Sequence, residues 1–208
     1  MIKLSKIATL LFLPCALLWA VSTFAATQSA TAQPPVVMLE GVTNQLLKGL
    51  KQQKNTSDKA LNQLVNRVLM PHIDLDTTSK IILGNYWNKA SATECDEFKK
   101  QFTLFIVRTY ANALSSYSNQ TVRYFPIRVG VTGSQTQVDS EIDQPNGQSV
   151  KVSYRLKLVG GSWQVYDFSV ENVSIVENYR SQFADTLRTK GLSGLNASLK
   201  SQNQAKSP

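Results

Sequence analysis

The spacing of apolar residues changes once along this chain, and that change constrains the fold more than any other feature. Before residue 117 apolar side chains recur every three to four positions, and from residue 121 they recur at every second position. The first spacing is typical of amphipathic helices and the second of half-buried strands. Strands that follow one another without helices between them form antiparallel sheets. The sequence therefore predicts an α+β fold, in which a curved four-stranded antiparallel meander sheet has helices on one face.

The predicted strands lie within residues 121–131, 134–142, 150–158 and 162–175, and the third alternates most regularly. Val150, Val152, Tyr154 and Leu156 point to one face of that strand, and lysine, serine and arginine point to the other. A twisted sheet with helices along one face tends to enclose a cone-like pocket. The apolar face is predicted to cover either the core of the protein or a bound apolar ligand.

The helical spacing predicts helices over residues 36–54, 58–69, 76–90 and 96–117, and a C-terminal helix that stops at Gly191. Pro71 ends the second helix, because proline disfavours helical backbone in the residue before it. Gly84 interrupts the third helix. Ser91, with Glu94 three positions later, predicts a capping box at the start of the fourth. Residues 203–208 are expected to form a frayed tail.

The N-terminal segment has the pattern of a secretory signal peptide. Lys3 and Lys6 precede the apolar run "IATLLFLPCALLWAV", and small residues follow it. We predict a signal peptide over residues 1–25, with cleavage possible as late as residue 32, then a flexible linker over 26–35 and a single domain over 36–202. A retained anchor is the alternative, although the run is short for a helix that spans a bilayer. Cleavage removes Cys15 and leaves Cys95, so no internal disulfide is expected.

The formal charge of +8 includes Lys3 and Lys6, so it falls to +6 after cleavage. A positive charge favours either simple solubility or attraction to anionic surfaces and acidic partners. Nucleic acid is not an expected partner, because no dense basic cluster has interleaved aromatic residues. Four cations are candidates for a basic outer face, with a merely solvated face as the alternative: Arg123, Arg128, Arg155 and Lys157.

Catalytic and metal-binding patterns have little support in this sequence. His72 and Cys95 are too far apart for metal-ligand spacing, and neither a G-x-S-x-G nor an S-x-x-K motif occurs. Asp167 is a candidate acid or, more simply, a structural hydrogen-bond acceptor. A His72–Asp74 pair is the other acid–base candidate. We predict no cofactor, no metal and no catalytic residue.

Several longer segments resemble the MlaC family of periplasmic phospholipid-binding proteins, also called the toluene-tolerance family. The resemblance covers residues 36–202 and is carried by "VLMPHIDLD", "ILGNYWNKAS", "FKKQFTLFIVRTYANALSSY", "GSWQVYDFSVENVSIVENYRSQF" and "GLSGLNASLKSQ". Asn172 stands where the family has glycine. Asparagine adopts positive φ more readily than most residues, so the turn is expected to survive.

The resemblance implies a curved sheet with helices, similar to nuclear-transport-factor-like cones, that holds one phospholipid with its tails inside. It implies a monomeric periplasmic carrier rather than an enzyme. Such a carrier moves lipid between an outer-membrane lipoprotein–porin complex and an inner-membrane ABC transporter with its substrate-binding subunit, and so maintains outer-membrane lipid asymmetry. The basic outer face of Arg123, Arg128, Arg155 and Lys157 is then a candidate for docking on these membrane partners. If docking uses it, Arg155→Glu should slow lipid transfer without lowering thermal stability.

On this hypothesis the acyl chains lie between the apolar sheet face and the helices at 76–90 and 96–117. The predicted lining residues are Ile81, Tyr86, Phe105, Phe125, Ile127, Val152, Tyr154, Leu156, Val165 and Val173. Two alternatives remain open. One is a hydrolase or isomerase that acts on an apolar substrate through His72 or Asp167, and the other is an exported adaptor whose interior is filled by its own side chains.

Overall fold

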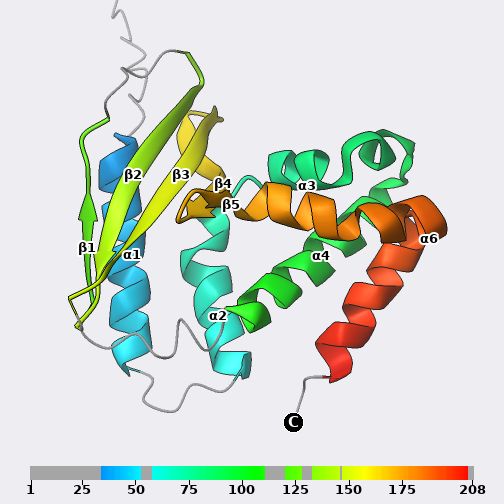
Figure 1. The fold of residues 1–208 in the computed structure, drawn as a ribbon, viewed down its shortest axis with the longest axis horizontal. Coiled ribbons are helices and arrows are strands. Elements are labelled where there is room, and N and C mark those ends of the chain that lie inside the picture. The colour runs from blue at the N-terminus through cyan, green and yellow to red at the C-terminus, as the bar shows by residue number, and fades with distance from the viewer. Residues whose placement is uncertain (1–33, 53–57, 111–119, 128–132, 146, 206–208) are drawn as a thin grey trace, which may run out of the picture. The chain divides into compact units, whose positions relative to one another are not determined.

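Five antiparallel strands in chain order form the sheet of this computed structural model, which describes residues 34–52, 58–110, 120–127, 133–145 and 147–205 (Figure 1). The strands are β1 (Thr121–Tyr124), β2 (Gln135–Asp143), β3 (Ser149–Val159), β4 (Ser162–Val170) and β5 (Val173–Ser174). The predicted α+β class and meander order are confirmed. The predicted count of four was wrong, because the end of the last predicted strand turns back and pairs with β4 as the short β5.

The register of the sheet places one set of side chains on a single covered face. Val138 of β2 pairs with Tyr154 of β3, and Leu156 pairs with Val165 of β4. A β-bulge between Arg155 and Leu156 shifts the β3–β4 register, so Arg155 pairs with Asp167. Such an extra residue re-aims the side chains that follow it. We call the side of the sheet that carries Val138, Tyr154 and Leu156 the covered face.

The helices are α1 (Pro35–Gln52), α2 (Asp58–Val68), α3 (Leu75–Leu83), α4 (Ala92–Thr109) and α6 (Ile175–Ala205), with short 3₁₀ segments η1 (Met70–His72) and η2 (Gly84–Lys89). The predicted helix over 76–90 divides at Gly84, whose φ of 53° ends α3. The capping box of Ser91 and Glu94 is confirmed. Residues 111–117, the end of the predicted fourth helix, lie outside the described residues.

The C-terminal helix α6 consists of two helical parts. Gly191, with φ 65° and ψ −171°, is non-helical and separates them at a kink, so the predicted stop at Gly191 is confirmed. The helix continues to Ala205, past residue 203, where we expected a frayed tail. Asn203 is buried and donates hydrogen bonds to the main-chain and side-chain oxygens of Gln101. These bonds tie the last turns of α6 to α4.

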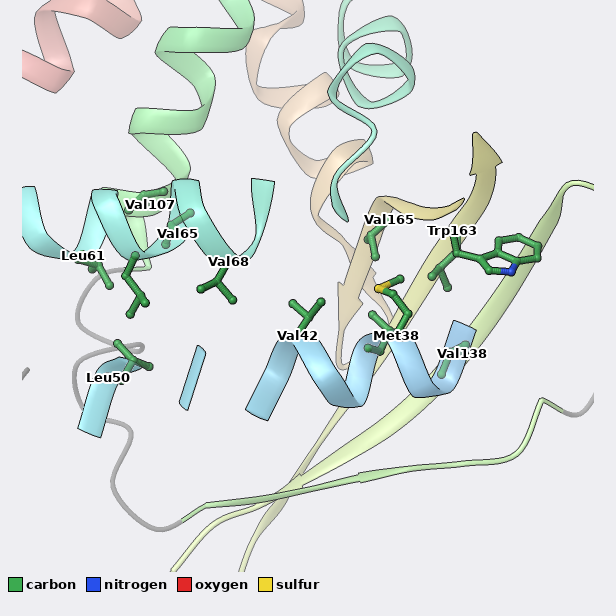
Figure 2. Packing of buried hydrophobic residues seen from close by; sticks show 13 residues of the cluster. Met38, Val42, Leu50, Leu61, Val65, Val68, Val107, Val138, Trp163 and Val165 are labelled. Carbon is green, nitrogen blue, oxygen red and sulfur yellow. The ribbon is translucent and has the colours of Figure 1, made fainter. Parts of the chain in front are cut away.

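Two hydrophobic clusters make up the core of residues 31–208, which form one compact unit. The sheet cluster joins α1 and α2 to the covered face and includes Met38, Leu39, Val42, Leu50, Leu61, Leu64, Val65, Val68, Val107, Val138, Leu156, Trp163 and Val165 (Figure 2). The aromatic cluster joins α3, α4 and α6 and includes Ile82, Leu83, Phe98, Phe102, Ile175, Val176, Tyr179, Phe183, Leu187, Leu192, Leu195 and Leu199. Among the described helices, none is long and apolar enough to cross a bilayer.

Candidate functional site

The covered face of the sheet is closed by α1, with α2 packed behind it. Met38, Leu39 and Val42 of α1 belong to the same cluster as Val138 and Leu156 of the sheet. Figure 2 shows Met38 directed from α1 toward Val165, Val68 of α2 directed toward α1, and Val65 of α2 beside Val107 of α4. All these side chains are aliphatic or thioether groups, which repack more readily than interlocked rings.

Four hydroxyl groups lie within this apolar surface, and we call them the hydroxyl row: Thr43, Tyr124, Ser140 and Tyr154. Thr43 Oγ1 and the Tyr124 hydroxyl are 2.6 Å apart. The rings of Tyr124 and Tyr154 have centroids 6.1 Å apart. Ser140 is buried and its hydroxyl donates to the carbonyl of Val152. The row therefore runs across β1, β2 and β3 and ends on α1.

Burial dominates the acid–base behaviour of both tyrosines in the row. It raises the pKa of Tyr124 far above the usual range, and the hydrogen bond to Thr43 opposes this only in part. Tyr154 interacts with the hydroxyls of Ser140 and Tyr124, but burial outweighs these interactions and raises its pKa as well. Both phenols are therefore neutral at physiological pH and can donate one hydrogen bond each.

The aromatic cluster has a different character. Phe98 stacks on Phe102 with ring centroids 5.4 Å apart, and Phe102 meets Tyr179 edge to face at the same distance. Tyr179 also stacks on Phe183 at 5.5 Å. Rings that interlock in this way hold α4 against α6 and gain about 0.5–1.5 kcal/mol per pair beyond their buried area. The cluster is a packed core between helices.

The structure distributes the predicted lining residues over several places. Ile127, Tyr154, Leu156 and Val165 belong to or pack against the sheet cluster, and Val152 is buried. Ile81, Tyr86 and Phe105 pack against the aromatic cluster instead. Val173 of β5 is 57% exposed, so it is not part of either cluster. Sequence reasoning missed Thr43, Tyr124 and Ser140. Val122 and Tyr124 are two positions apart on one strand and therefore share a face, and this spacing would have placed Tyr124 on an apolar face.

Surface hollows among the described residues are polar where they are best formed. One of about 380 Å³ is lined by Ile73, Asp74, Leu75, Asp76, Lys99, Val159 and Gln164. The other, of about 440 Å³, is lined by Phe125, Gln137, Asp139, Ser140, Glu141, Lys151, Ser153 and Asn172. Charged side chains line both hollows, whereas a ligand pocket is mostly apolar with a few placed polar groups. Phe125, a predicted lining residue, therefore borders a polar hollow.

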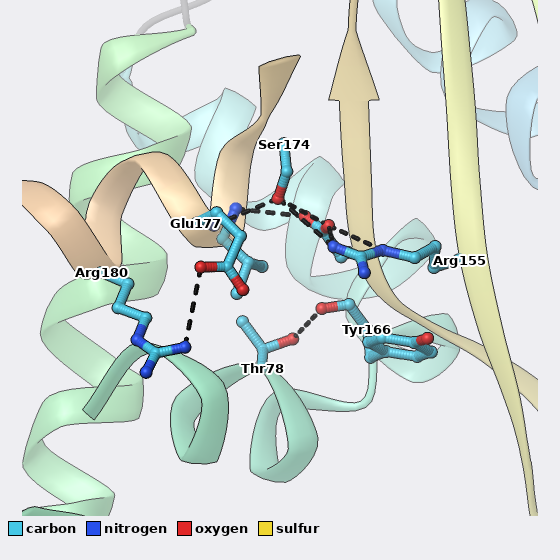
Figure 3. Close-up of polar contacts among 8 residues, drawn as sticks. Thr78, Arg155, Tyr166, Ser174, Glu177 and Arg180 are labelled. Carbon is cyan, nitrogen blue, oxygen red and sulfur yellow. Dashed lines mark hydrogen bonds and ion pairs between the residues drawn. The ribbon is translucent and has the colours of Figure 1, made fainter. Parts of the chain in front are cut away.

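Asp167 is the most buried charged group of the described chain, and it joins β3, β4, β5 and α6. Its side chain has no solvent exposure and pairs with the guanidinium of Arg155. It also accepts hydrogen bonds from the Ser174 hydroxyl at 2.7 Å and the Val176 amide at 3.1 Å (Figure 3). Nearby, the Thr78 hydroxyl donates to the carbonyl of Tyr166. With both carboxylate oxygens engaged, Asp167 has the environment of a structural acceptor rather than of a proton-transfer group.

Asp74, the other acid considered for catalysis, caps α3. Its carboxylate accepts from the amide and the hydroxyl of Thr77. This arrangement satisfies orphan donors at a helix N-terminus. Asp74 thus has a sufficient structural role without a partnership to His72.

Comparison with known proteins places the chain in a family. The family model "MlaC protein" matches residues 40–201. The chain belongs to the MlaC family. It is 31% identical over 167 residues to the toluene tolerance protein ttg2D of Pseudomonas putida, and the aligned region covers 78% of this chain and 77% of that protein. It is 27% identical over 186 residues to the intermembrane phospholipid transport system binding protein MlaC of Haemophilus influenzae, covering 86% and 87%.

A solved structure is similar as well. It is the phospholipid-binding protein from Ralstonia solanacearum in complex with a phospholipid, with a TM-score of 0.76 and 27% identity over 81% of this chain and 96% of that one. The family's glycine position carries Asn172 here. Its φ of 64°, next to 49° at Glu171, confirms the prediction that asparagine supports the turn between β4 and β5.

The cations predicted to dock on membrane partners of an MlaC protein are mostly paired within this chain. Arg123 bonds to Glu141 and Asp143 of β2. Arg155 pairs with the buried Asp167, and Lys157 donates a long hydrogen bond to Thr77. Arg128 lies outside the described residues. Since Arg155 compensates a buried charge, its replacement is expected to lower stability, contrary to our expectation from the sequence.

Proposed function

We propose that this protein is a phospholipid carrier, and that it holds the acyl chains between the covered face of the sheet and α1. The observation that carries the proposal is the similarity in fold and sequence to a phospholipid-binding protein in complex with a phospholipid. The sheet cluster supports it, because it offers an aliphatic surface beneath α1, with α2 packed behind that helix. Tyr154, Leu156, Val165 and Ile127 are the proposed contacts on the sheet side, together with Val152.

The physical need for a carrier follows from the free-energy cost of exposing the acyl chains of a lipid to water. Two acyl chains contain roughly 30 methylenes, and each is worth about 0.8 kcal/mol on leaving water. The total is on the order of 24 kcal/mol, which prevents spontaneous crossing of an aqueous gap. A carrier replaces the bilayer with its own hydrocarbon. Its affinity relative to a membrane has to be near balance, because a much tighter site would never release its cargo.

We further propose the route and the compartment. The signal-peptide pattern at residues 1–25 supports export to the periplasm. The family supports exchange between an outer-membrane lipoprotein–porin complex and an inner-membrane ABC transporter with its substrate-binding subunit, and hence a role in outer-membrane lipid asymmetry. We propose that the carrier acts as a monomer and not as an enzyme.

The first test is native mass spectrometry of the mature protein purified from the periplasm, followed by solvent extraction and uptake from vesicles that contain a labelled phospholipid. We expect a co-purifying mass that fragments as a phospholipid. A protein that is free of lipid and takes none from the vesicles would refute the proposal.

A matched pair of variants tests where the acyl chains of the bound lipid lie. Val42→Phe adds bulk between α1 and the sheet, whereas Leu187→Phe adds similar bulk within the aromatic cluster; both sites are buried. Overpacking costs about 1–3 kcal/mol at either site. If the acyl chains lie on the covered face, Val42→Phe should reduce the bound lipid and Leu187→Phe should not. Equal losses in two folded variants would contradict the proposed location.

A further inference from the structure

The hydroxyl row is an unusual element of the sheet cluster, because a hydroxyl in apolar surroundings is costly unless it is hydrogen-bonded. Here Thr43 and Tyr124 satisfy one another at 2.6 Å, and the Ser140 hydroxyl donates to the Val152 carbonyl. The Tyr154 ring lies beside the Tyr124 ring, with centroids 6.1 Å apart. Packing of the sheet against α1 alone would be served equally well by phenylalanine, valine and alanine at these positions.

We propose that the hydroxyl row is the subsite for the ester carbonyls of a diacyl lipid, with Tyr124 as the principal donor. This inference rests on the proposed carrier function and adds the ligand group that the row recognises. Each hydroxyl can donate as well as accept, so a bond within the row can be exchanged for a bond to a carbonyl. The aliphatic side chains around the row then surround the first methylenes of the acyl chains.

Helix α1 occupies this subsite in the structure described here. It supplies both partners of the Tyr124 hydroxyl, namely Thr43 Oγ1 at 2.6 Å and the Leu39 carbonyl at 3.5 Å. Movement of α1 away from the sheet therefore frees the Tyr124 donor and uncovers the aliphatic surface in the same step. A lipid that enters this space can replace the α1 acceptors with its own carbonyl oxygens.

The charge around the row favours a neutral carbonyl over a phosphate. The four groups of the row are hydroxyls, which are neutral donors and offer a phosphate no positive charge. A buried phosphate would also require a paired cation, whereas an ester carbonyl requires only a neutral donor. The phosphate is therefore expected nearer to solvent.

The test compares two lipids that differ only in the proposed recognition group. Unlabelled protein takes up lipid from vesicles of a phosphatidylethanolamine with two ester-linked chains, or of its dialkyl ether analogue with the same chain length. One neutral hydrogen bond corresponds to about a two- to tenfold preference. We expect wild-type protein to prefer the ester by this factor and Tyr124→Phe to lose the preference.

Tyr179→Phe is the matched control, because Tyr179 is also a buried tyrosine but belongs to the aromatic cluster. It should keep the wild-type ratio. Thr43→Val removes the α1 partner of Tyr124 and leaves the donor, so its ester preference should be equal to or larger than that of the wild type. If Tyr124→Phe does not fold, as judged by circular dichroism, Tyr154→Phe and Ser140→Ala replace it.

An ester-to-ether ratio of one in wild-type protein that takes up both lipids would overturn the inference and leave the carrier proposal intact. A ratio that Tyr124→Phe leaves unchanged would do the same. If wild-type protein takes up neither lipid, the carrier proposal itself fails.

Discussion

The contrast between Arg155 and Arg123 provides the sharpest test of how this fold is held together. Arg123 lies on β1 and Arg155 on β3, and both pair with acids. The sequence placed the two arginines in one group. Their partners differ. Asp167 has no solvent exposure, whereas the side chains of Glu141 and Asp143 are 24% and 35% exposed. We predict that Arg155→Gln strongly destabilises the protein and that Arg123→Gln has little effect.

The expected loss of stability in Arg155→Gln follows from the charge of Asp167, which is left without a partner. Removal of one partner of a buried ion pair typically costs about 3–5 kcal/mol, because the remaining charge is uncompensated. The guanidinium of Arg155 is itself 38% exposed, so solvent screening reduces its share of the interaction. We therefore expect a loss of roughly 2–3 kcal/mol, or about 5–10 °C in Tm for a domain of this size.

Urea denaturation at neutral pH measures this loss, with Arg123→Gln as the matched control on the same sheet. A double-mutant cycle isolates its origin. Asp167→Asn removes the charge and keeps one acceptor oxygen, enough for either the Val176 amide or the Ser174 hydroxyl. Arg155→Gln should therefore cost much less in the Asp167→Asn background. Equal losses for the two arginine variants, or the same loss with and without the Asp167 charge, would refute the reasoning.

Three further predictions concern the turn, the helix contact and the acid limit. Asn172→Val should lower the free energy of unfolding by about 1 kcal/mol relative to Asn172→Gly, because the φ of 64° suits glycine and not a β-branched residue; equal denaturation midpoints would contradict this. Gly49→Ala should lower Tm, because the new Cβ would lie 2.4 Å from Cδ1 of the buried Leu64. Gly41→Ala should raise Tm, because a Cβ at Gly41 would meet no atom within 4 Å and alanine favours helix more than glycine does. Thermal melts that rank the two variants the other way would exclude the close α1–α2 contact. Arg123 and Ser149 lower the pKa of Asp143 to about 2, below its ordinary 3.8. The stability from this carboxylate is therefore complete above pH 4 and is lost as pH falls from about 4 to 2. Arg123→Gln should flatten the acid limb of a plot of denaturation midpoint against pH by the same small amount that it lowers the midpoint at neutral pH, because the pair is exposed to solvent.

Local chemistry made much of this fold predictable from the sequence. The capping box at Ser91, the break at Gly84 and the turn at Asn172 all depend on one residue and its immediate neighbours, and all three appear in the structure. The same is true of the alternation that predicted the antiparallel sheet. Each of these features is a backbone preference that survives in almost any tertiary context.

The errors concern contacts between elements that are far apart in the sequence. The aromatic stripe of α4 was expected to face the sheet, but Phe98, Phe102 and Phe105 meet Tyr179 and Phe183 of α6 instead. Arg155 was assigned to an outer face, either for docking or merely solvated, because its strand alternates regularly. The bulge beside it, which brings it opposite Asp167, leaves no mark in that alternation.

The division of the core into two clusters suggests why a carrier of this kind can open without unfolding. The ring pairs between α4 and α6 and the bonds of Asp167 lie outside the surface that a lipid would enter, so they stay intact when α1 moves. What α1 loses is the burial of a few aliphatic side chains, each worth about 1.5–3 kcal/mol. Acyl chains that take the place of α1 bury the same sheet surface again. The exchange is then close to balanced in free energy, which is what a protein that has to both collect and deliver lipid requires.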